Sequence, residues 1–488
     1  MVENRGRVKV IPHFSFVGYR LSRIQGRTTQ TLRRAFPTFR VVRKFVAIVL
    51  TVIAFWDAKA QTNTLSLADA KQIAFEQNWN LLAARSGVDA AVAQLIVARE
   101  FPNPTASLST AKIGRTDAGT VPGNSLWYRN YDSIAAVSQL IEIGGKRHDR
   151  QMAARAGILS AKARFYDAKR TLDQGVTKAY VAALLAGESA RNLTESAGYM
   201  RHEATIAEAQ HAAGDLSEAD MKTLEINADQ FELQAKTAEA AAVQARIAVE
   251  ILMGLDQPEG NWTPADTLEQ MAASALPAEA GNINTNVNTN GNTTVNANGI
   301  HIARPDVLAA ETDLRAAEAN LKLQKAERIP DPTFSVGVEH EPPGGGPDVN
   351  TFNIGVSFPL PIWNLNGGNI KAAQAAVDQS RIALEQTRAQ AVADVATAES
   401  EYGEAYARWL RYRDQTAPKS ARVRETIEFK YDAGAATLVD LLNAEQTDNT
   451  IRLAFAQAMN DTASAAADLT AARLTLSETE VQEANVGQ

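Results

Sequence analysis

Ile329-Pro-Asp-Pro-Thr-Phe-Ser-Val-Gly-Val338 is the stretch that decides the fold, because its prolines end a helix and its alternating residues start a strand. The same order occurs earlier in the chain, where Phe101-Pro-Asn-Pro-Thr105 also precedes alternating residues. Pro102 and Pro330 are 228 positions apart. The chain therefore contains two copies of one unit, each far longer than the repeats of solenoids or propellers.

Glycines mark the same duplication. Gly144-Gly145 and Gly367-Gly368 are 223 positions apart, and each pair precedes a long alanine-rich run. We expect these pairs to separate strands from helices, as we expect of the four prolines Pro102, Pro104, Pro330 and Pro332. Each alanine-rich run contains one turn signal, Gly214 in the first copy and Gly434 in the second, where a helical hairpin should reverse.

The patterns predict a mainly α fold with a small β part. In the first copy we expect a helix over 67–100, strands over 105–113 and 131–143, and a hairpin of helices over 146–213 and back to about 253. In the second copy the hairpin runs from 369 to 431 and returns to about 474, with Pro418 as a candidate interruption. From 172 to 207 mostly small apolar residues follow the 3-4 spacing of a coiled-coil seam, which suits closely packed helices.

Composition excludes several chemistries. The 488 residues include no cysteine, so thiolate metal sites, disulfides and a lipidated cysteine are absent from this sequence. Residues 1–60 combine a basic segment, an apolar run and Ala58-Lys-Ala60, which predicts a basic extension followed by a cleaved signal peptide. If translation started at Val41 or Val42, the chain would begin with an ordinary signal peptide. The remaining chain has 37 Lys or Arg and 54 Asp or Glu, and this acidic balance disfavours nucleic-acid partners.

The predicted organisation follows from these signals. We expect the first repeat at 61–254, an inter-repeat segment at 255–300 and the second repeat at 301–475, followed by a tail at 476–488. An Asn- and Thr-rich tract at 281–299 lies in the inter-repeat segment and is too polar to form a core, so we interpret it as a linker.

Strands of about ten alternating residues are long enough to cross a bilayer in a β-barrel. Four strands cannot close a barrel, and lipid does not tolerate open sheet edges, so a barrel would have to be shared among copies of the chain. The alternative from periodicity alone is a soluble four-stranded sheet that caps a helical bundle.

Five motifs then carry a resemblance to a family. They are Val137-Ser-Gln-Leu-Ile-Glu-Ile-Gly-Gly-Lys-Arg147, Arg304-Pro-Asp306, Arg328-Ile-Pro-Asp-Pro332, Val356-Ser-Phe-Pro-Leu-Pro-Ile-Trp-Asn-Leu-Asn-Gly-Gly-Asn-Ile370 and Tyr431-Asp-Ala-Gly-Ala-Ala-Thr-Leu-Val-Asp-Leu-Leu-Asn-Ala444. In this order the chain resembles the TolC-type outer-membrane efflux factors from about 65 to 475. The Gly-Gly-Lys-Arg and Phe-Pro-Leu-Pro-Ile-Trp-Asn stretches are most similar to the branch that serves cobalt, zinc and cadmium exporters.

The resemblance implies a homotrimer with a twelve-stranded barrel in the outer-membrane lipid, continued by an α-helical barrel through the periplasm. It implies a passive exit duct without a cofactor. The duct would dock to a periplasmic adaptor protein and to an inner-membrane transporter of the resistance-nodulation-division type. Heavy-metal cations are the preferred substrates, and drugs or secreted proteins are the alternative.

The family's periplasmic gate carries acidic residues just after the hairpin turn. Asp440 matches that pattern, Asp220 is its counterpart in the first copy, and Asn443 stands where the family has a second gate acid. By symmetry each carboxylate would form a ring of three charges that attracts cations and repels itself. The alternative is that both are ordinary solvated helix residues.

Other functions have weaker support. A periplasmic adaptor or coiled-coil scaffold would share the long hairpins, but it would lack paired strands of bilayer length. An enzyme is disfavoured because no convergent set of catalytic residues is evident. Gly144-Gly-Lys146 lacks the rest of a phosphate loop, and we interpret Glu339-His-Glu341 and the pair His202 and His211 as polar surface rather than as metal sites.

Overall fold

The computed structural model describes residues 64–111, 132–274, 304–341 and 349–476, all within the compact unit Thr62–Gln488. The predictions for the N-terminal segment 1–60, for the Asn- and Thr-rich tract 281–299 and for nearly all of the tail fall outside these residues, as does the loop of each strand pair.

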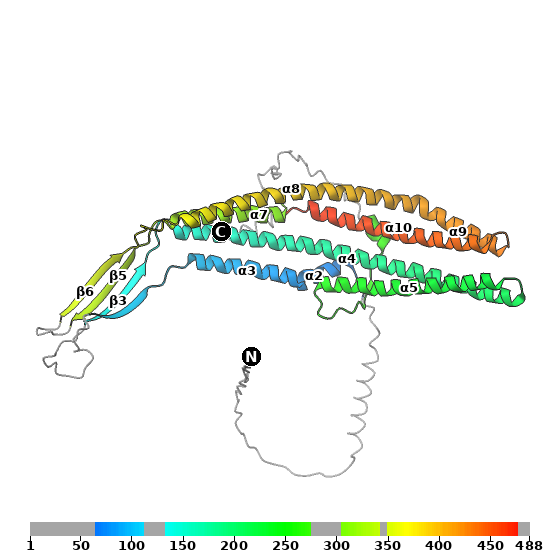
Figure 1. Cartoon of the computed structure of the whole chain (residues 1–488), viewed down its shortest axis with the longest axis horizontal. Coiled ribbons are helices and arrows are strands. Elements are labelled where there is room, and N and C mark those ends of the chain that lie inside the picture. The colour runs from blue at the N-terminus through cyan, green and yellow to red at the C-terminus, as the bar shows by residue number, and fades with distance from the viewer. Residues whose placement is uncertain (1–63, 112–131, 275–303, 342–348, 477–488) are drawn as a thin grey trace, which may run out of the picture. The chain divides into compact units, whose positions relative to one another are not determined.

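The described elements repeat the order of helix, strand pair and helical hairpin (Figure 1). The first copy comprises β1 Thr64–Leu65, α2 Leu67–Gln77, α3 Trp79–Arg99, β2 Thr105–Ala111, β3 Asp132–Leu140, α4 Lys146–Ala213 and α5 Glu218–Met253. The short β4 Thr263–Pro264 and α6 Leu268–Ser274 follow it. The second copy comprises α7 Pro305–Ala326, β5 Thr333–Glu341, β6 Val349–Ser357, α8 Gly367–Arg411, the π-helical turn η2 Tyr412–Thr416, α9 Ala417–Asp432 and α10 Leu438–Arg473. The prediction of a mainly α chain with a small β part is confirmed.

The two copies share one antiparallel sheet of order β2-β3-β5-β6. The contact between β3 and β5 joins the copies, with Val137 opposite Val336. A second, two-stranded sheet pairs β1 with β4. The larger sheet lies at one end of the helices, and the hairpin turns lie at the other end (Figure 1).

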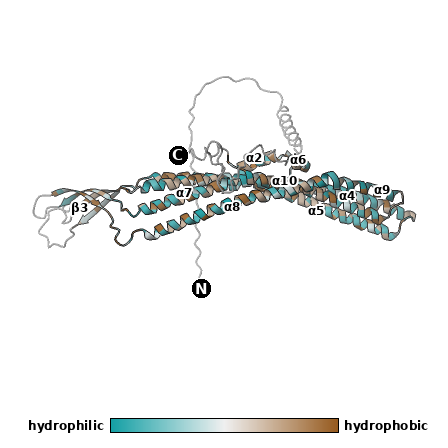
Figure 2. Cartoon of the chain, turned by 90° about the horizontal axis from the view of Figure 1, so that it is seen from above, coloured by the Kyte–Doolittle hydropathy of each residue, from teal (hydrophilic) through white to brown (hydrophobic). Residues whose placement is uncertain are grey.

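Small residues let the helices pack closely. α4 packs against α3, α5, α7 and α10, and hydrophobic and polar residues alternate along the helices (Figure 2). Near the hairpin turns the core consists of Met200, Ala204, Ala207, Leu224 and Ala228. Closer to the middle of α4, Tyr180 is fully buried, stacks on Trp262 and donates its hydroxyl to Leu65 O at 2.8 Å. The predicted 3-4 seam is therefore a real packing surface.

Pro418 is accommodated by a local change of helix type. It stands in the first turn of α9, directly after the five-residue π turn Tyr412–Thr416. Because proline has no N–H and clashes with the preceding turn, a regular α-helix cannot continue through it. The predicted interruption is present, and the chain passes it without changing direction enough to break the hairpin (Figure 1).

The prediction of one helix over 67–100 is wrong at Asn78, which separates α2 from α3. Its backbone is extended, with φ −60° and ψ 125°. The side-chain oxygen accepts hydrogen bonds from the N–H groups of Asn80 and Leu81 at 3.0 and 3.1 Å. The amide donates to Leu252 O at 2.9 Å, so a contact with the end of α5 fixes the break.

The second helix–strand break also differs from the expectation. Gly367 and Gly368 lie in the first turn of α8, and the left-handed residue before the helix is Asn366, with φ 57°. Asparagine tolerates this conformation, and its side chain donates to Gln324 O at 2.8 Å. In the first copy Gly144 and Gly145 are themselves left-handed, with φ 75° and 83°.

Replacing Gly254 with alanine should destabilise the fold. Gly254 ends α5 with φ 83°, and an added Cβ would lie 2.5 Å from Gln77 O, directly beside the Asn78 break. We expect Gly254→Ala to cost about 1–3 kcal/mol and to lower the midpoint of thermal unfolding in detergent. Gly187→Ala is the control, since a Cβ there meets nothing within 4 Å. Equal midpoints for the two variants would contradict the packing described here.

Candidate functional site

The four-stranded sheet has one apolar and one polar face. Across the sheet Val137, Val336 and Ile354 form one row, and Ser138, Ser335 and Gly355 form the next. The large apolar residues of this sheet on the first face are Leu108, Val137, Phe334, Val336, Val338, Phe352, Ile354 and Val356, and all are exposed. The opposite face carries mainly serine, glycine, threonine and asparagine.

The exposed apolar face is large for a surface in water. Leu108 and Ile354 are 88% and 83% exposed within one chain. β5 and β6 have nine residues each, which is the length that crosses a bilayer when strands are tilted. In the described sheet β2 and β6 are edge strands, so each leaves backbone groups without a strand partner.

The hairpin turns are built on left-handed glycines. Gly214 ends α4 with φ 84° and donates its N–H to His211 O at 3.0 Å. Gly434 follows α9 with φ 69° and donates to Tyr431 O at 2.9 Å. A side chain would be strained at either position, so both turns depend on glycine.

Asp440 and Asp220 lie in the first turns of the two return helices, α10 and α5. The Asp440 carboxylate accepts hydrogen bonds from the Thr437 hydroxyl and N–H at 2.6 and 3.0 Å, which completes a capping box. These donors lower the pKa of Asp440. Asp220 accepts from the Ser217 hydroxyl at 2.7 Å. Both residues are exposed. The capping role of Asp440 has a signal in the sequence, which is the Thr437-x-x-Asp440 spacing.

Asn443 lies one helical turn beyond Asp440. Both line an open groove of about 480 Å³ between α9 and α10. The other side chains of its wall include Lys419, Val423 and Ile427. The groove brings the two candidate residues of the second copy to one surface, whereas Asp220 belongs to the other hairpin.

A buried acidic cluster between the hairpins was not predicted. Glu203 of α4 and Glu445 of α10 are 9% and 7% exposed. Burial, followed by the nearby Asp432 carboxylate, raises the pKa of Glu203. Burial also raises the pKa of Glu445, although Arg424 of α9 lies 3.4 Å away. No local motif could reveal this cluster, because its members come from three helices.

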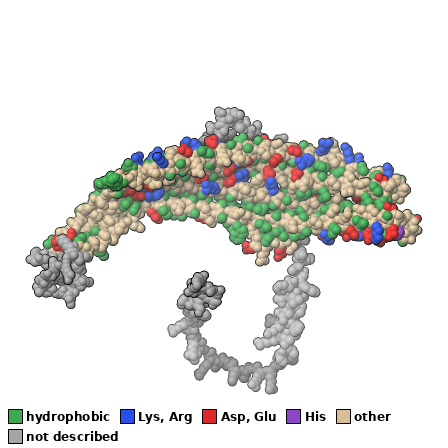
Figure 3. All heavy atoms as spheres, viewed as in Figure 1, with side chains coloured by type: hydrophobic (Ala, Val, Ile, Leu, Met, Phe, Trp, Pro, Cys, Tyr) green, Lys and Arg blue, Asp and Glu red, His purple; other side chains and the backbone are tan. Residues whose placement is uncertain are grey.

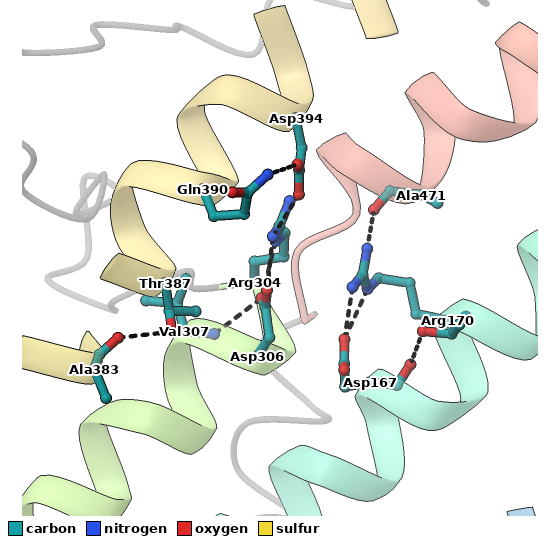
Figure 4. Close-up of polar contacts among 11 residues, drawn as sticks. Asp167, Arg170, Arg304, Asp306, Val307, Ala383, Thr387, Gln390, Asp394 and Ala471 are labelled. Atoms are coloured by element: carbon teal, nitrogen blue, oxygen red, sulfur yellow. Dashed lines mark hydrogen bonds and ion pairs between the residues drawn. The ribbon is translucent and has the colours of Figure 1, made fainter. Parts of the chain in front are cut away.

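The Arg304-Pro-Asp306 motif holds the start of the second copy against α8 (Figure 4). Arg304 is 8% exposed and donates to both Asp306 oxygens at 2.8 and 2.6 Å. A second ion pair joins it to Asp394 at 3.0 Å. The role of this motif is to fix the approach of α7 to α8.

The remaining candidates lie apart from one another. His340 contacts Asn350 at 3.0 Å, and His211 contacts Leu216 O at 3.0 Å in the hairpin turn. Among the described residues no group of three or more His, Asp or Glu side chains has a metal-binding arrangement.

The raised pKa of Glu203 makes a pH-dependent prediction. A carboxyl whose pKa is raised by folding favours the folded state when protonated, and this contribution is lost as the pH rises through the folded pKa. Glu203 faces Tyr199, His202, Glu428 and Asp432. Glu203→Gln should therefore raise the thermal midpoint at neutral pH by about 1–3 °C, and less near pH 4.

Glu208→Gln is the matched control, because Glu208 is exposed on the same helix. A gain at neutral pH that is equal for both variants, or that does not shrink on acidification, would contradict the assignment to buried Glu203.

The geometry can be compared with known proteins. The family model described as outer membrane efflux protein matches residues 71–255 and 300–473. Cobalt-zinc-cadmium resistance protein CzcC of Cupriavidus metallidurans is 25% identical over 405 residues, which cover 82% of this chain and 88% of that protein. Pyoverdine export outer membrane protein OpmQ of Pseudomonas aeruginosa is 25% identical over 311 residues, covering 61% and 60%.

A solved structure shares the fold. The structure of CusC, reported in connection with transmembrane channel formation, superposes with a TM-score of 0.62 at 17% identity. The match covers 83% of this chain and 91% of that one. At this identity the likeness concerns the fold, including the arrangement of strand pairs and long hairpins.

Proposed function

The chain belongs to the outer membrane efflux protein family, and from this premise we propose that three copies form the passive exit duct of a tripartite efflux pump for heavy-metal cations. The observation that carries the proposal is the four-stranded sheet, which has an exposed apolar face and, among the described residues, two edge strands without a partner. The apolar face of such a sheet is unfavourable in water, and its edge strands cannot stay unpaired in lipid.

Three chains meet both requirements. If β2 of one chain pairs with β6 of the next, three sheets close into a barrel of twelve strands with the apolar face toward lipid. The serine-, glycine- and asparagine-rich face then lines the pore. An adaptor or scaffold protein would have no use for strands of this length, so the sheet favours the channel over that alternative.

The hairpins supply the periplasmic part. α4 alone has 68 residues, and at about 1.5 Å per residue it extends to roughly 100 Å. The neighbouring helix α3 also has an exposed apolar face. Among the described helices it is the one long and apolar enough to span a membrane, yet only 17% of its apolar stretch is buried in the single chain. Trp79, Ile96 and Val97 are exposed. We propose that this face packs on another copy, as helices in a closed wall would.

A periplasmic adaptor protein and an inner-membrane transporter of the resistance-nodulation-division type complete the proposed pump. A passive duct needs no catalytic group and no cofactor. The preference for metal cations rests on CzcC, whose match covers most of both chains, whereas the match to OpmQ covers about three fifths of each. Deletion should reduce tolerance of cobalt, zinc or cadmium; loss of drug tolerance alone would contradict the metal assignment.

The proposed gate consists of Asp440 and Asp220, one ring of three carboxylates from each hairpin. Because carboxylates at a constriction attract cations, Asp440→Asn should weaken block of single-channel current by divalent cations in a planar bilayer. The amide keeps an oxygen that can accept from Thr437, so this variant separates the charge from the helix cap. Asn443→Asp should strengthen block by adding a further ring of carboxylates beside that of Asp440.

Thr437→Ala is the control for the cap, since it removes both hydrogen bonds of the Thr437 hydroxyl with Asp440 and keeps the charge. Block that is unchanged in Asp440→Asn but lost in Thr437→Ala would show that Asp440 acts only as a capping residue.

A further inference from the structure

The junction between β6 and α8 is an exposed apolar segment. Ser357 ends the strand and Gly367 begins the helix, so the connection has nine residues, against five between β3 and α4 in the first copy. All residues of 358–365 are exposed, and none is charged. The large apolar residues in it are Phe358, Leu360, Ile362, Trp363 and Leu365, with exposed fractions of 56%, 66%, 67%, 95% and 52%. Figure 3 shows a hydrophobic patch where the sheet meets the helices.

Hydrogen bonds hold this segment in place. The N–H of Ile362 donates to Leu360 O at 2.9 Å across Pro361. Asn366 donates its N–H to the Asn364 side chain at 2.9 Å and its amide to Gln324 O at 2.8 Å. The apolar side chains are therefore presented outward by a fixed turn that is anchored on α7.

The segment continues the apolar face of the sheet. Val356 lies on that face, and alternation places Phe358 and Leu360 on the same side beyond the end of the strand. The proposed function sets this face against lipid, with strands that span the hydrocarbon layer. The residues just beyond β6, on the side of the helices, then reach the boundary between hydrocarbon and periplasmic water.

The chemistry of the segment suits that boundary. Tryptophan gathers at membrane–water interfaces because its ring is apolar and its N–H seeks a polar partner. Next to the sheet in the first copy, the exposed Phe101 ring lies 3.9 Å from the Arg147 guanidinium. Arg147 also donates to Arg99 O at 2.6 Å, which leaves a fixed positive charge at this level of the fold for lipid phosphates.

We propose that Phe358–Leu365 is a membrane anchor that inserts Trp363 among the phospholipid headgroups of the periplasmic leaflet of the outer membrane. The inference rests on the proposed function, which places the helices in the periplasm. The first copy's shorter junction has exposed Ile141 and Ile143 but no aromatic residue, and between them Glu142 pairs with Arg150 at 2.7 Å. Each chain therefore contributes one such tryptophan.

The absence of cysteine from the sequence allows a direct depth measurement. Single cysteines replace Trp363, Leu365, Ile354 and Glu208 in the full chain, and each carries a nitroxide in vesicles of phosphatidylethanolamine and phosphatidylglycerol. Leu365→Cys leaves Trp363 in place. Glu208→Cys is the matched control, since Glu208 is exposed near the end of α4 that lies at the hairpin turns, away from the sheet. Depth is read from the ratio of collisions with oxygen to collisions with a water-soluble nickel chelate.

We expect the ratio at 363 and 365 to be several-fold above that at 208 and below that at 354. Ratios at 363 and 365 that equal the value at 208, with 354 in hydrocarbon, would overturn the anchor and leave the channel intact. Labels at 363 and 365 that are shielded from both reagents would assign the segment to a contact with a second copy, and also overturn the anchor. A value at 354 typical of water would contradict the proposed function itself.

Discussion

Backbone N–H and C=O groups that face lipid must find partners within protein, and the proposed assembly of several chains follows from this constraint. The sheet β2-β3-β5-β6 satisfies its interior strands and leaves two edges. Its apolar face is exposed, while its polar face is built mainly from small hydroxyl, amide and glycine residues. Both features become favourable only when several sheets close around a pore. The main reason for the proposed assembly is therefore hydrogen bonding between strand edges, and helix packing is secondary.

In the helical part the constraint is different, because long helices must pack closely with few large side chains between them. Alanine-rich seams such as those around Ala204 and Ala228 let long helices approach closely, and large side chains gather mainly around Tyr180 and Trp262. Near the turns, Glu203 and Glu445 are buried between the hairpins. Burying an ionised carboxylate costs free energy, so such residues are uncommon in a protein core. Burial raises the pKa of both carboxyls, so their ionised forms at neutral pH weaken the contact between the hairpins.

Local signals predicted most of the fold. The limits of α4 were evident because 146–213 has no proline and has Gly145 and Gly214 at its two ends, and β5 and β6 were evident from strict alternation. The break at Asn78 was hidden because its cause is a contact with Leu252, 174 positions away. The capping role of Asp440 could have been recognised from Thr437, whereas the cluster of Glu203 and Glu445 depends on how the hairpins meet and had no signal in the sequence.

The mass of the complex extracted from the outer membrane tests the central claim most directly. Native mass spectrometry after gentle detergent extraction should give one species of three chains, because the proposed barrel pairs the edges of three four-stranded sheets into twelve strands. A single-chain mass, or recovery of the protein as a monomer in the soluble periplasmic fraction, would contradict the account.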